Sequence, residues 1–246
     1  MKTKFTRLWS ILLALAMVVG MLPIMALAAG PATATADFST APTTALELLN
    51  AAKTGEADST WDNVTKTLTL GGVNFTTTAA IAVKLPDGAT IVLNGENMIK
   101  SGSKNNGYGI YAEGSLTISG SGTLNVTGDT ANSYSYGIYT NNGNISVTGG
   151  TVNAYGGEAN FSRGIEAGNN ISISGGIVNT KGGKATRFTG YGIIASNSLI
   201  ISCGSLIAAG TSGSKNICAL NMPLITLPRH SLLVAHLGQR RLYCVY

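Results

Sequence analysis

The stretch GIEAGNNISISGGIVNTKGG, residues 164–183, contains a Gly-Ile pair, an Ile-Ser-Ile-Ser phrase and two Gly-Gly pairs. Apolar and small polar residues alternate within its phrases, which is the pattern of a β-strand with one buried face. The glycines between the phrases supply the positive φ angles that tight corners need. This stretch therefore predicts three short strands that are joined by corners.

The same phrases recur along the chain at a nearly constant spacing. The Gly-Ile pairs are 28, 27 and 28 residues apart and begin at Gly109, Gly137, Gly164 and Gly192. A strand phrase like residues 171–174 follows each pair, and a third phrase like residues 177–180 follows that one. Weaker copies extend the pattern in both directions, and such self-similarity at a fixed period is typical of repeat proteins.

Three strands and three corners in about 27 residues make one coil of a solenoid, whose strands stack in parallel about 4.8 Å apart. We therefore predict an all-β fold, a right-handed single-stranded parallel β-helix of about six coils over residues 61–236. Its core is expected to contain stacked residues such as Ile110, Ile138, Ile165 and Ile193, and Asn125, Asn153 and Asn179 are expected to form an outward ladder.

The N-terminal segment differs from the repeat. Basic residues precede the apolar run Leu8–Leu22, and Ala26-Leu27-Ala28 fits a cleavage site. We interpret residues 1–28 as a secretory signal peptide rather than a retained membrane anchor. Residues 29–60 are expected to hold a linker and a capping helix at about 43–53, begun by a capping box at residues 44–47.

The charge of the chain lies mostly at its ends. The net charge is +5, but six basic residues lie in the signal-peptide segment or at the C-terminal end: Lys2, Lys4, Arg7, Arg229, Arg240 and Arg241. The body is close to neutral, which gives no support to nucleic-acid binding. Residues 237–246 form an atypical tail that abandons the repeat. Three sparse cysteines fit neither a disulfide framework nor a metal site.

Aromatic residues flank the Gly-Ile pairs, and stacking of the coils should bring them into two columns. The residues before the pairs are Tyr108, Tyr136, Arg163 and Tyr191. Those after the first three pairs are Tyr111, Tyr139 and Glu166. Tyrosine offers a flat apolar face for a sugar ring and a hydroxyl group for hydrogen bonds. These columns are the candidate ligand-binding residues. The alternative is a structural stack in which a cation–π contact holds Arg163.

Acidic residues give a second candidate site. Asp129, Glu158 and Lys184 are predicted to take the same position in the corner after the third strand of successive coils, and two stacked acids repel each other unless a cation lies near them. Calcium held by Asp129 and Glu158 is one interpretation. A solvated acid pair that Lys184 stabilises is the other.

Catalytic constellations are scarce. Carboxylates after residue 88 are few, both histidines lie near the C-terminal end, and no phosphate-binding loop is present. The composition therefore favours a protein that is not an enzyme, although polysaccharide lyase activity stays open.

At the level of motifs, residues 107–128 (GYGIYAEGSLTISGSGTLNVTG) and 164–183 resemble the secreted bacterial β-helix carbohydrate-binding domain family, with the resemblance spanning roughly residues 60–236. It implies a polysaccharide-lyase-like fold, binding of cellulose or acidic plant sugars, and calcium as a ligand. We expect a secreted or cell-surface bacterial protein, a monomer that is free of the membrane after signal cleavage, with polysaccharide or cell-wall glycan as its partner. The alternative is a structural or adhesive surface protein.

Overall fold

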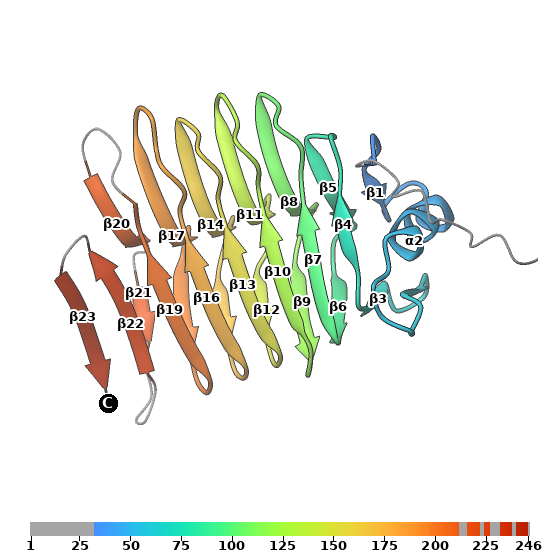
Figure 1. Ribbon diagram of the computed structural model, residues 1–246. Helices are drawn as coiled ribbons and strands as arrows, with labels where there is room; N and C mark the ends of the chain where they lie inside the picture. Colours follow the sequence, from blue (N-terminus) through green and yellow to red (C-terminus); the bar gives the residue numbers. More distant parts are fainter. Residues whose placement is uncertain (1–31, 212–215, 222–223, 227–231, 238–239, 246) are drawn as a thin grey trace, which may run out of the picture. The chain divides into compact units, whose positions relative to one another are not determined.

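A computed structural model describes residues 32–211, 216–221, 224–226, 232–237 and 240–245. The predicted signal peptide, residues 1–28, lies outside the described residues. Within the described part, no helix is long and apolar enough to cross a membrane. The segment from residue 32 onward is built from three β-sheets, which share one core (Figure 1).

Successive strands along the chain belong to the three sheets in turn. Sheet 1 contains β1 (Ala36–Asp37), β5 (Ile81–Leu85), β8 (Asn106–Ala112), β11 (Tyr134–Thr140), β14 (Phe161–Ala167), β17 (Thr189–Ala195) and β20 (Asn216–Asn221). Sheet 2 contains β2 (Thr60–Asp62), β3 (Thr67–Gly71), β6 (Ala89–Asn94), β9 (Leu116–Gly120), β12 (Ile145–Val147), β15 (Ile171–Ile173), β18 (Ser198–Ile201) and β21 (Leu224–Thr226). Sheet 3 contains β4 (Asn74–Thr76), β7 (Glu96–Lys100), β10 (Thr123–Thr127), β13 (Thr151–Tyr155), β16 (Ile177–Lys181), β19 (Ser205–Ala209), β22 (Leu232–Leu237) and β23 (Arg240–Val245).

Neighbouring strands within each sheet pair in parallel along the repeat, which confirms the predicted parallel β-helix. Ile138 aligns with Ile110 on one side and with Ile165 on the other, as the sequence repeat requires. The solenoid has about five turns, and β20, β21 and β22 continue the same parallel pairing. Two pairs are antiparallel, β2 with β3 and β22 with β23, so the predicted tail at residues 237–246 contributes a hairpin strand.

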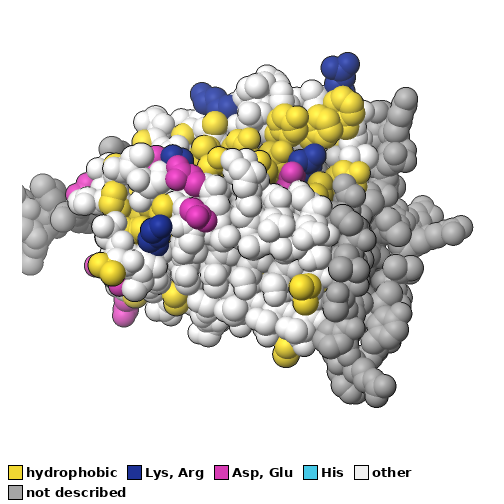
Figure 2. Space-filling view, turned by 180° about the vertical axis from the view of Figure 1, so that it is seen from behind, with side chains coloured by type: hydrophobic (Ala, Val, Ile, Leu, Met, Phe, Trp, Pro, Cys, Tyr) yellow, Lys and Arg dark blue, Asp and Glu magenta, His cyan; other side chains and the backbone are white. Residues whose placement is uncertain are grey.

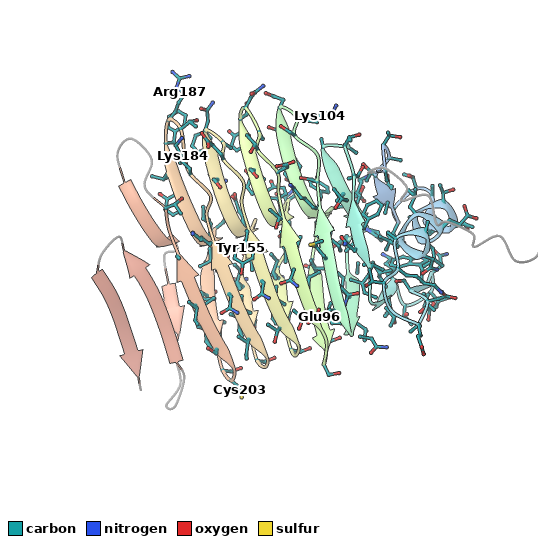
Figure 3. The ribbon with its side chains drawn as sticks, viewed as in Figure 1. Glu96, Lys104, Tyr155, Lys184, Arg187 and Cys203 are labelled. Atoms are coloured by element: carbon teal, nitrogen blue, oxygen red, sulfur yellow. The ribbon has the colours of Figure 1, made fainter. Side chains whose placement is uncertain are left out.

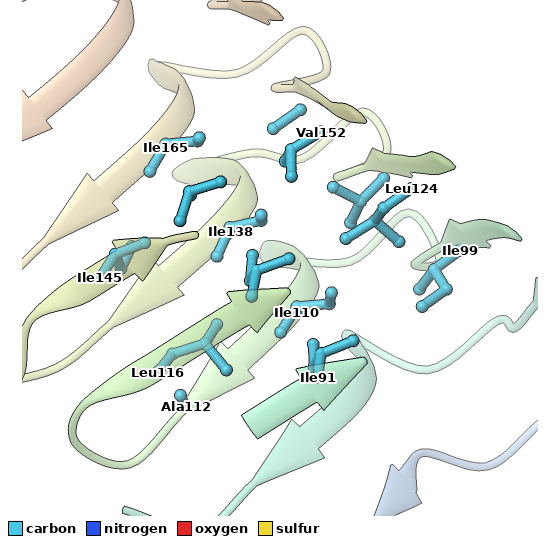
Figure 4. Close-up of a cluster of buried hydrophobic side chains, with 14 of the residues drawn as sticks. Ile91, Ile99, Ile110, Ala112, Leu116, Leu124, Ile138, Ile145, Val152 and Ile165 are labelled. Atoms are coloured by element: carbon cyan, nitrogen blue, oxygen red, sulfur yellow. The ribbon is translucent and has the colours of Figure 1, made fainter. Parts of the chain in front are cut away.

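The core consists of stacked columns of apolar side chains. Ile110, Ile138, Ile165 and Ile193 are each at most 1% exposed, as predicted. Leucine, isoleucine and valine from sheets 2 and 3 complete each layer, and Figure 4 shows these side chains following one another from coil to coil. Each inward apolar residue packs on the apolar residues of the coils above and below. A repeat of simple composition can therefore bury a continuous core.

The N-terminal helix packs against this core. Helix α2 (Pro42–Ala51) buries Ala45 and Leu49, which confirms a helix in the predicted region. The predicted capping box is wrong, since the N-cap residue is Ala41 and no side chain caps the helix. Pro42 at the first helical position has a fixed φ and lacks an amide hydrogen, so it begins the helix before Thr44 is reached.

Gly176 forms the corner between sheets 2 and 3 with a φ of +76°, and a Cβ there would lie 2.4 Å from the carbonyl oxygen of Gly150. We expect Gly176→Ala to lower the free energy of unfolding by about 2 kcal/mol or more, because alanine is strained in this conformation and the neighbouring backbone must move. Chemical denaturation measures this, with exposed Ser174→Ala as the matched control. Equal midpoints for the two variants would contradict the assigned role of the corner.

Candidate carbohydrate-binding face

Strands β8, β11, β14 and β17 of sheet 1 carry the aromatic side chains predicted from the sequence. Tyr136 aligns with Tyr108 and with Arg163, and Arg163 aligns with Tyr191. In the second column, Tyr139 aligns with Tyr111 and with Glu166, and Glu166 aligns with Ile194. The predicted alignment of the two columns is thus confirmed.

The tyrosine rings contact one another within and between the columns. The ring centroids of Tyr108 and Tyr136 are 5.0 Å apart with the planes 9° from parallel. Those of Tyr111 and Tyr139 are 5.6 Å apart, and those of Tyr136 and Tyr139 are 4.9 Å apart. Tyr136 is 4% exposed, whereas the other three rings are half-buried. Ring contacts therefore hold the rings in place while part of the surface of Tyr108, Tyr111 and Tyr139 stays accessible.

A third aromatic column lies beside these two. Tyr134 aligns with Phe161 at a centroid separation of 5.0 Å, and Phe161 stacks on Phe188 at 4.2 Å. This third column was not predicted, because the predicted columns contained only the residues that adjoin each Gly-Ile pair. An aromatic residue three positions before Gly137 and Gly164 was the available signal, whereas Phe188 lies four positions before Gly192.

We define the aromatic face as the rings of these three columns, which are Tyr108, Tyr111, Tyr134, Tyr136, Tyr139, Phe161, Phe188 and Tyr191. Phe188 is its most accessible large apolar side chain, at 46% exposure. The space-filling view from behind shows hydrophobic side chains gathered in a band, with a basic and an acidic side chain beside each other within it (Figure 2). Contiguous apolar surface of this kind marks an interaction site more often than scattered exposed residues do.

Arg163 and Glu166 form an ion pair within the face. The Arg163 Nη1 group donates hydrogen bonds to Glu166 Oε2 and, at 3.1 Å, to the Tyr136 hydroxyl oxygen. The guanidinium carbon lies 5.5 Å from the ring centroids of both Tyr136 and Phe161, so the cation–π contact foreseen from the sequence is present. Burial raises the pKa of Glu166, and the charge of Arg163 offsets part of that increase.

The other charges near the tyrosine columns are also paired. Lys84 aligns with Tyr111 in the preceding coil, and its Nζ atom lies 2.8 Å from Glu113 Oε1 and 3.5 Å from Asp37 Oδ2. Desolvation raises the pKa of Tyr136 above its ordinary value, so its phenol stays neutral even at moderately alkaline pH. The tyrosine columns are thus largely apolar, and the charged side chains Lys84, Glu113, Arg163 and Glu166 beside them are paired.

A family model described as carbohydrate-binding domain-containing protein matches residues 56–198. The chain belongs to this family. The match covers more than half of the chain and includes every residue of the aromatic face. No curated protein and no solved structure matches the chain.

The acids predicted to hold calcium in this carbohydrate-binding domain are not aligned with each other. The amide of Ala131 donates to the carbonyl oxygen of Glu158, which aligns Thr130 rather than Asp129 with Glu158. Glu158 instead lies beside Lys184, at 2.9 Å between Oε1 and Nζ (Figure 3 labels the lysine). Asp129 Oδ2 lies 3.5 Å from Lys100 Nζ. The contacts match the ion-pair interpretation, and calcium binding stays a prediction.

The folding stability of the domain is predicted to fall at alkaline pH because of Tyr108. Burial raises its pKa from 10.0 to about 12. Above pH 10 the unfolded chain releases this proton while the folded chain keeps it, so the contribution to stability is complete below pH 10 and is lost as the pH rises through about 12. Denaturation at a series of pH values should therefore show a shallower decline for Tyr108→Phe than for the wild type. Identical slopes would contradict the assignment.

Proposed function

We propose that the protein is a secreted, non-catalytic β-helix that binds polysaccharide at a cell surface, with the aromatic face as its binding surface. The observation that carries this proposal is the alignment of tyrosines in successive coils on one sheet. The family of the matched domain supports the same ligand class. The signal-peptide pattern of residues 1–28 supports secretion.

The periodicity of the face suits an extended glycan. Coils repeat every ~4.8 Å, which is close to the length of one sugar unit in a straight chain. A polysaccharide lying along the solenoid therefore meets an equivalent position of the repeat at each sugar unit. Tyr108 and Tyr111 form one such step, and Tyr139, which packs on the buried Tyr136, forms the next. Aromatic rings stack on the apolar faces of pyranose rings, and the phenol hydroxyl groups donate to sugar oxygens.

Several contacts support a binding role rather than a catalytic one. Hydrolysis requires an acid and a base or nucleophile on either side of the scissile bond. On this sheet the carboxylates of Glu113 and Glu166 are each engaged by a cation. A lyase would need a free base beside a group that neutralises a uronate. Arg163 is held by Glu166, and the raised pKa of Tyr136 disfavours its phenolate as a base.

Retention on insoluble polysaccharides tests the proposal. The full chain is mixed with cellulose, xylan, pectin and a bacterial cell-wall preparation, with and without calcium, and the bound fraction is measured. Saturable retention on at least one of these is expected, without release of products that absorb in the ultraviolet. Absence of retention on all of them would favour the structural or adhesive alternative, and absorbing products would establish a lyase.

Calcium has its own test, which is titration calorimetry. Each predicted ligand already pairs with a lysine, and no group of three or more His, Cys, Asp or Glu side chains in the described residues is arranged to hold a metal ion. Calcium prefers six to eight oxygen ligands, so the calcium prediction requires carbonyl oxygens beside the two acids and expects a saturable heat that disappears in Asp129→Ala. The absence of any calcium heat, which the ion-pair interpretation expects, would contradict the calcium prediction.

A further inference from the structure

A hollow lies between the segment that follows helix α2 and the corner that connects β6 to β7. It consists of two adjoining cavities of about 380 and 210 Å³, both lined by Thr54 and Glu96. We name it the corner hollow, defined by Thr54, Glu56, Asn74, Glu96, Met98 and Asn125. Figure 3 shows Glu96 at the beginning of β7, in sheet 3 rather than in the sheet of the aromatic face.

Backbone contacts fix the walls of the corner hollow. The amide of Thr54 donates to the carbonyl oxygen of Gly72 at 2.8 Å, and the amide of Asn74 donates to that of Ala52 at 2.8 Å. Gly72 and Gly95, with φ angles of +87° and +68°, turn the chain at two corners of the lining. The hollow is therefore formed before any ligand arrives, which lowers the entropic cost of binding.

The predicted asparagine ladder ends in this hollow. Asn179 Nδ2 donates to Asn153 Oδ1, and Asn153 Nδ2 donates to Asn125 Oδ1, each at 2.8 Å. The next position in the column is Met98, whose side chain accepts hydrogen bonds only weakly. Asn125 Nδ2 consequently makes no hydrogen bond within the described residues. It is the terminal donor of a polarised chain, and it lines the smaller cavity.

Acceptors and an apolar surface complement this donor. The carboxylates of Glu56 and Glu96 form no ion pair or hydrogen bond with any described residue. The nearby Lys53 pairs with Asp58 instead, at 2.5 Å between Nζ and Oδ1. Met98 exposes 43% of its surface beside them. A ligand that fits must offer hydroxyl donors, a hydroxyl acceptor and an apolar edge, and it must carry no negative charge.

We propose that the corner hollow is a second carbohydrate site, which binds one neutral pyranose ring through neighbouring hydroxyl groups. Glu96 accepts from one hydroxyl, Asn125 donates to the next, and the thioether of Met98 packs on the ring carbons. The ring is either a free sugar or the end of a chain, since the hollow does not continue the columns of the aromatic face. This site is independent of the proposed polysaccharide surface.

Methyl NMR on the full chain labelled with ¹³C-methyl methionine tests the site, with the Met98 resonance assigned by Met98→Leu. Titration with glucose, galactose and xylose should shift this resonance saturably for at least one sugar, and glucuronate should leave it in place. Cello-oligosaccharides distinguish chain-end binding from binding of the free ring. Glu96→Gln should weaken the affinity at least ~10-fold, because a charge-assisted hydrogen bond is lost.

Two outcomes would overturn the second site. One is a Met98 resonance that none of these sugars shifts. The other is an unchanged affinity in Glu96→Gln, with folding verified by circular dichroism. The double variant Tyr111→Ala/Tyr139→Ala should keep the shift, so failure of the aromatic face and failure of the corner hollow are distinguishable.

Discussion

The double variant Tyr111→Ala/Tyr139→Ala is expected to lose most of its retention on whichever insoluble polysaccharide binds the wild type. These two half-buried rings contact each other across successive coils with their planes tilted by 35°, and their removal eliminates two adjacent steps of the proposed glycan track. At about 1 kcal/mol per stacked sugar or more, the loss of both corresponds to an affinity at least ~30-fold weaker. A depletion isotherm on the same polysaccharide measures the change.

A control of the same residue type is available on another sheet. Tyr155 lies at the end of β13 in sheet 3 and is 36% exposed (Figure 3). Tyr155→Ala should leave retention unchanged. Equal losses in Tyr155→Ala and in the double variant would mean that the rings of sheet 1 have no special role.

Ile138→Ala should produce a large loss of stability. Ile138 is fully buried between Ile110 and Ile165, so the cavity it leaves adjoins the coils on both sides. Truncation of a buried isoleucine costs about 2–5 kcal/mol, and rigid stacked coils leave little scope for collapse of the cavity. Chemical denaturation followed by circular dichroism gives the value.

Ser146→Ala is the matched surface control for the core variant. Ser146 points outward on β12, aligned with Thr117 and Ser172. Its replacement should change the free energy of unfolding by no more than about 0.5 kcal/mol. A core variant as stable as this control would contradict the assignment of inward and outward faces.

The alignment of residues within the paired strands was predictable from the sequence. Inside a strand, one residue of slippage would turn the apolar side chains outward, so the Gly-Ile repeat determined the alignment of Tyr136 with Tyr108 and of Tyr139 with Tyr111. The isoleucine columns were predictable for the same reason. Their local pattern and the register of the fold agree because both have a period of two residues.

The corners were less predictable, because their lengths vary. Six residues separate β10 from β11, five separate β13 from β14, and seven separate β16 from β17. The seven-residue corner places Phe188 one position further from its Gly-Ile pair. Asp129 is displaced for another reason, because the strand register continues into the corner and aligns Thr130 with Glu158. The corner hollow was also not predicted. The segment after α2 and the corner between β6 and β7 both line it, and no sequence motif links these two segments.

The most direct test of the central claim is the dependence of affinity on the length of a soluble oligosaccharide from the polysaccharide that the protein retains. The predicted track crosses the coils of Tyr111, Tyr139, Glu166 and Ile194, three steps of ~4.8 Å. Affinity measured by calorimetry should therefore rise with each added sugar up to about four units and then level off, and the rise should disappear in Tyr111→Ala/Tyr139→Ala. A rise of the same size in that variant, or an affinity independent of length, would contradict the account.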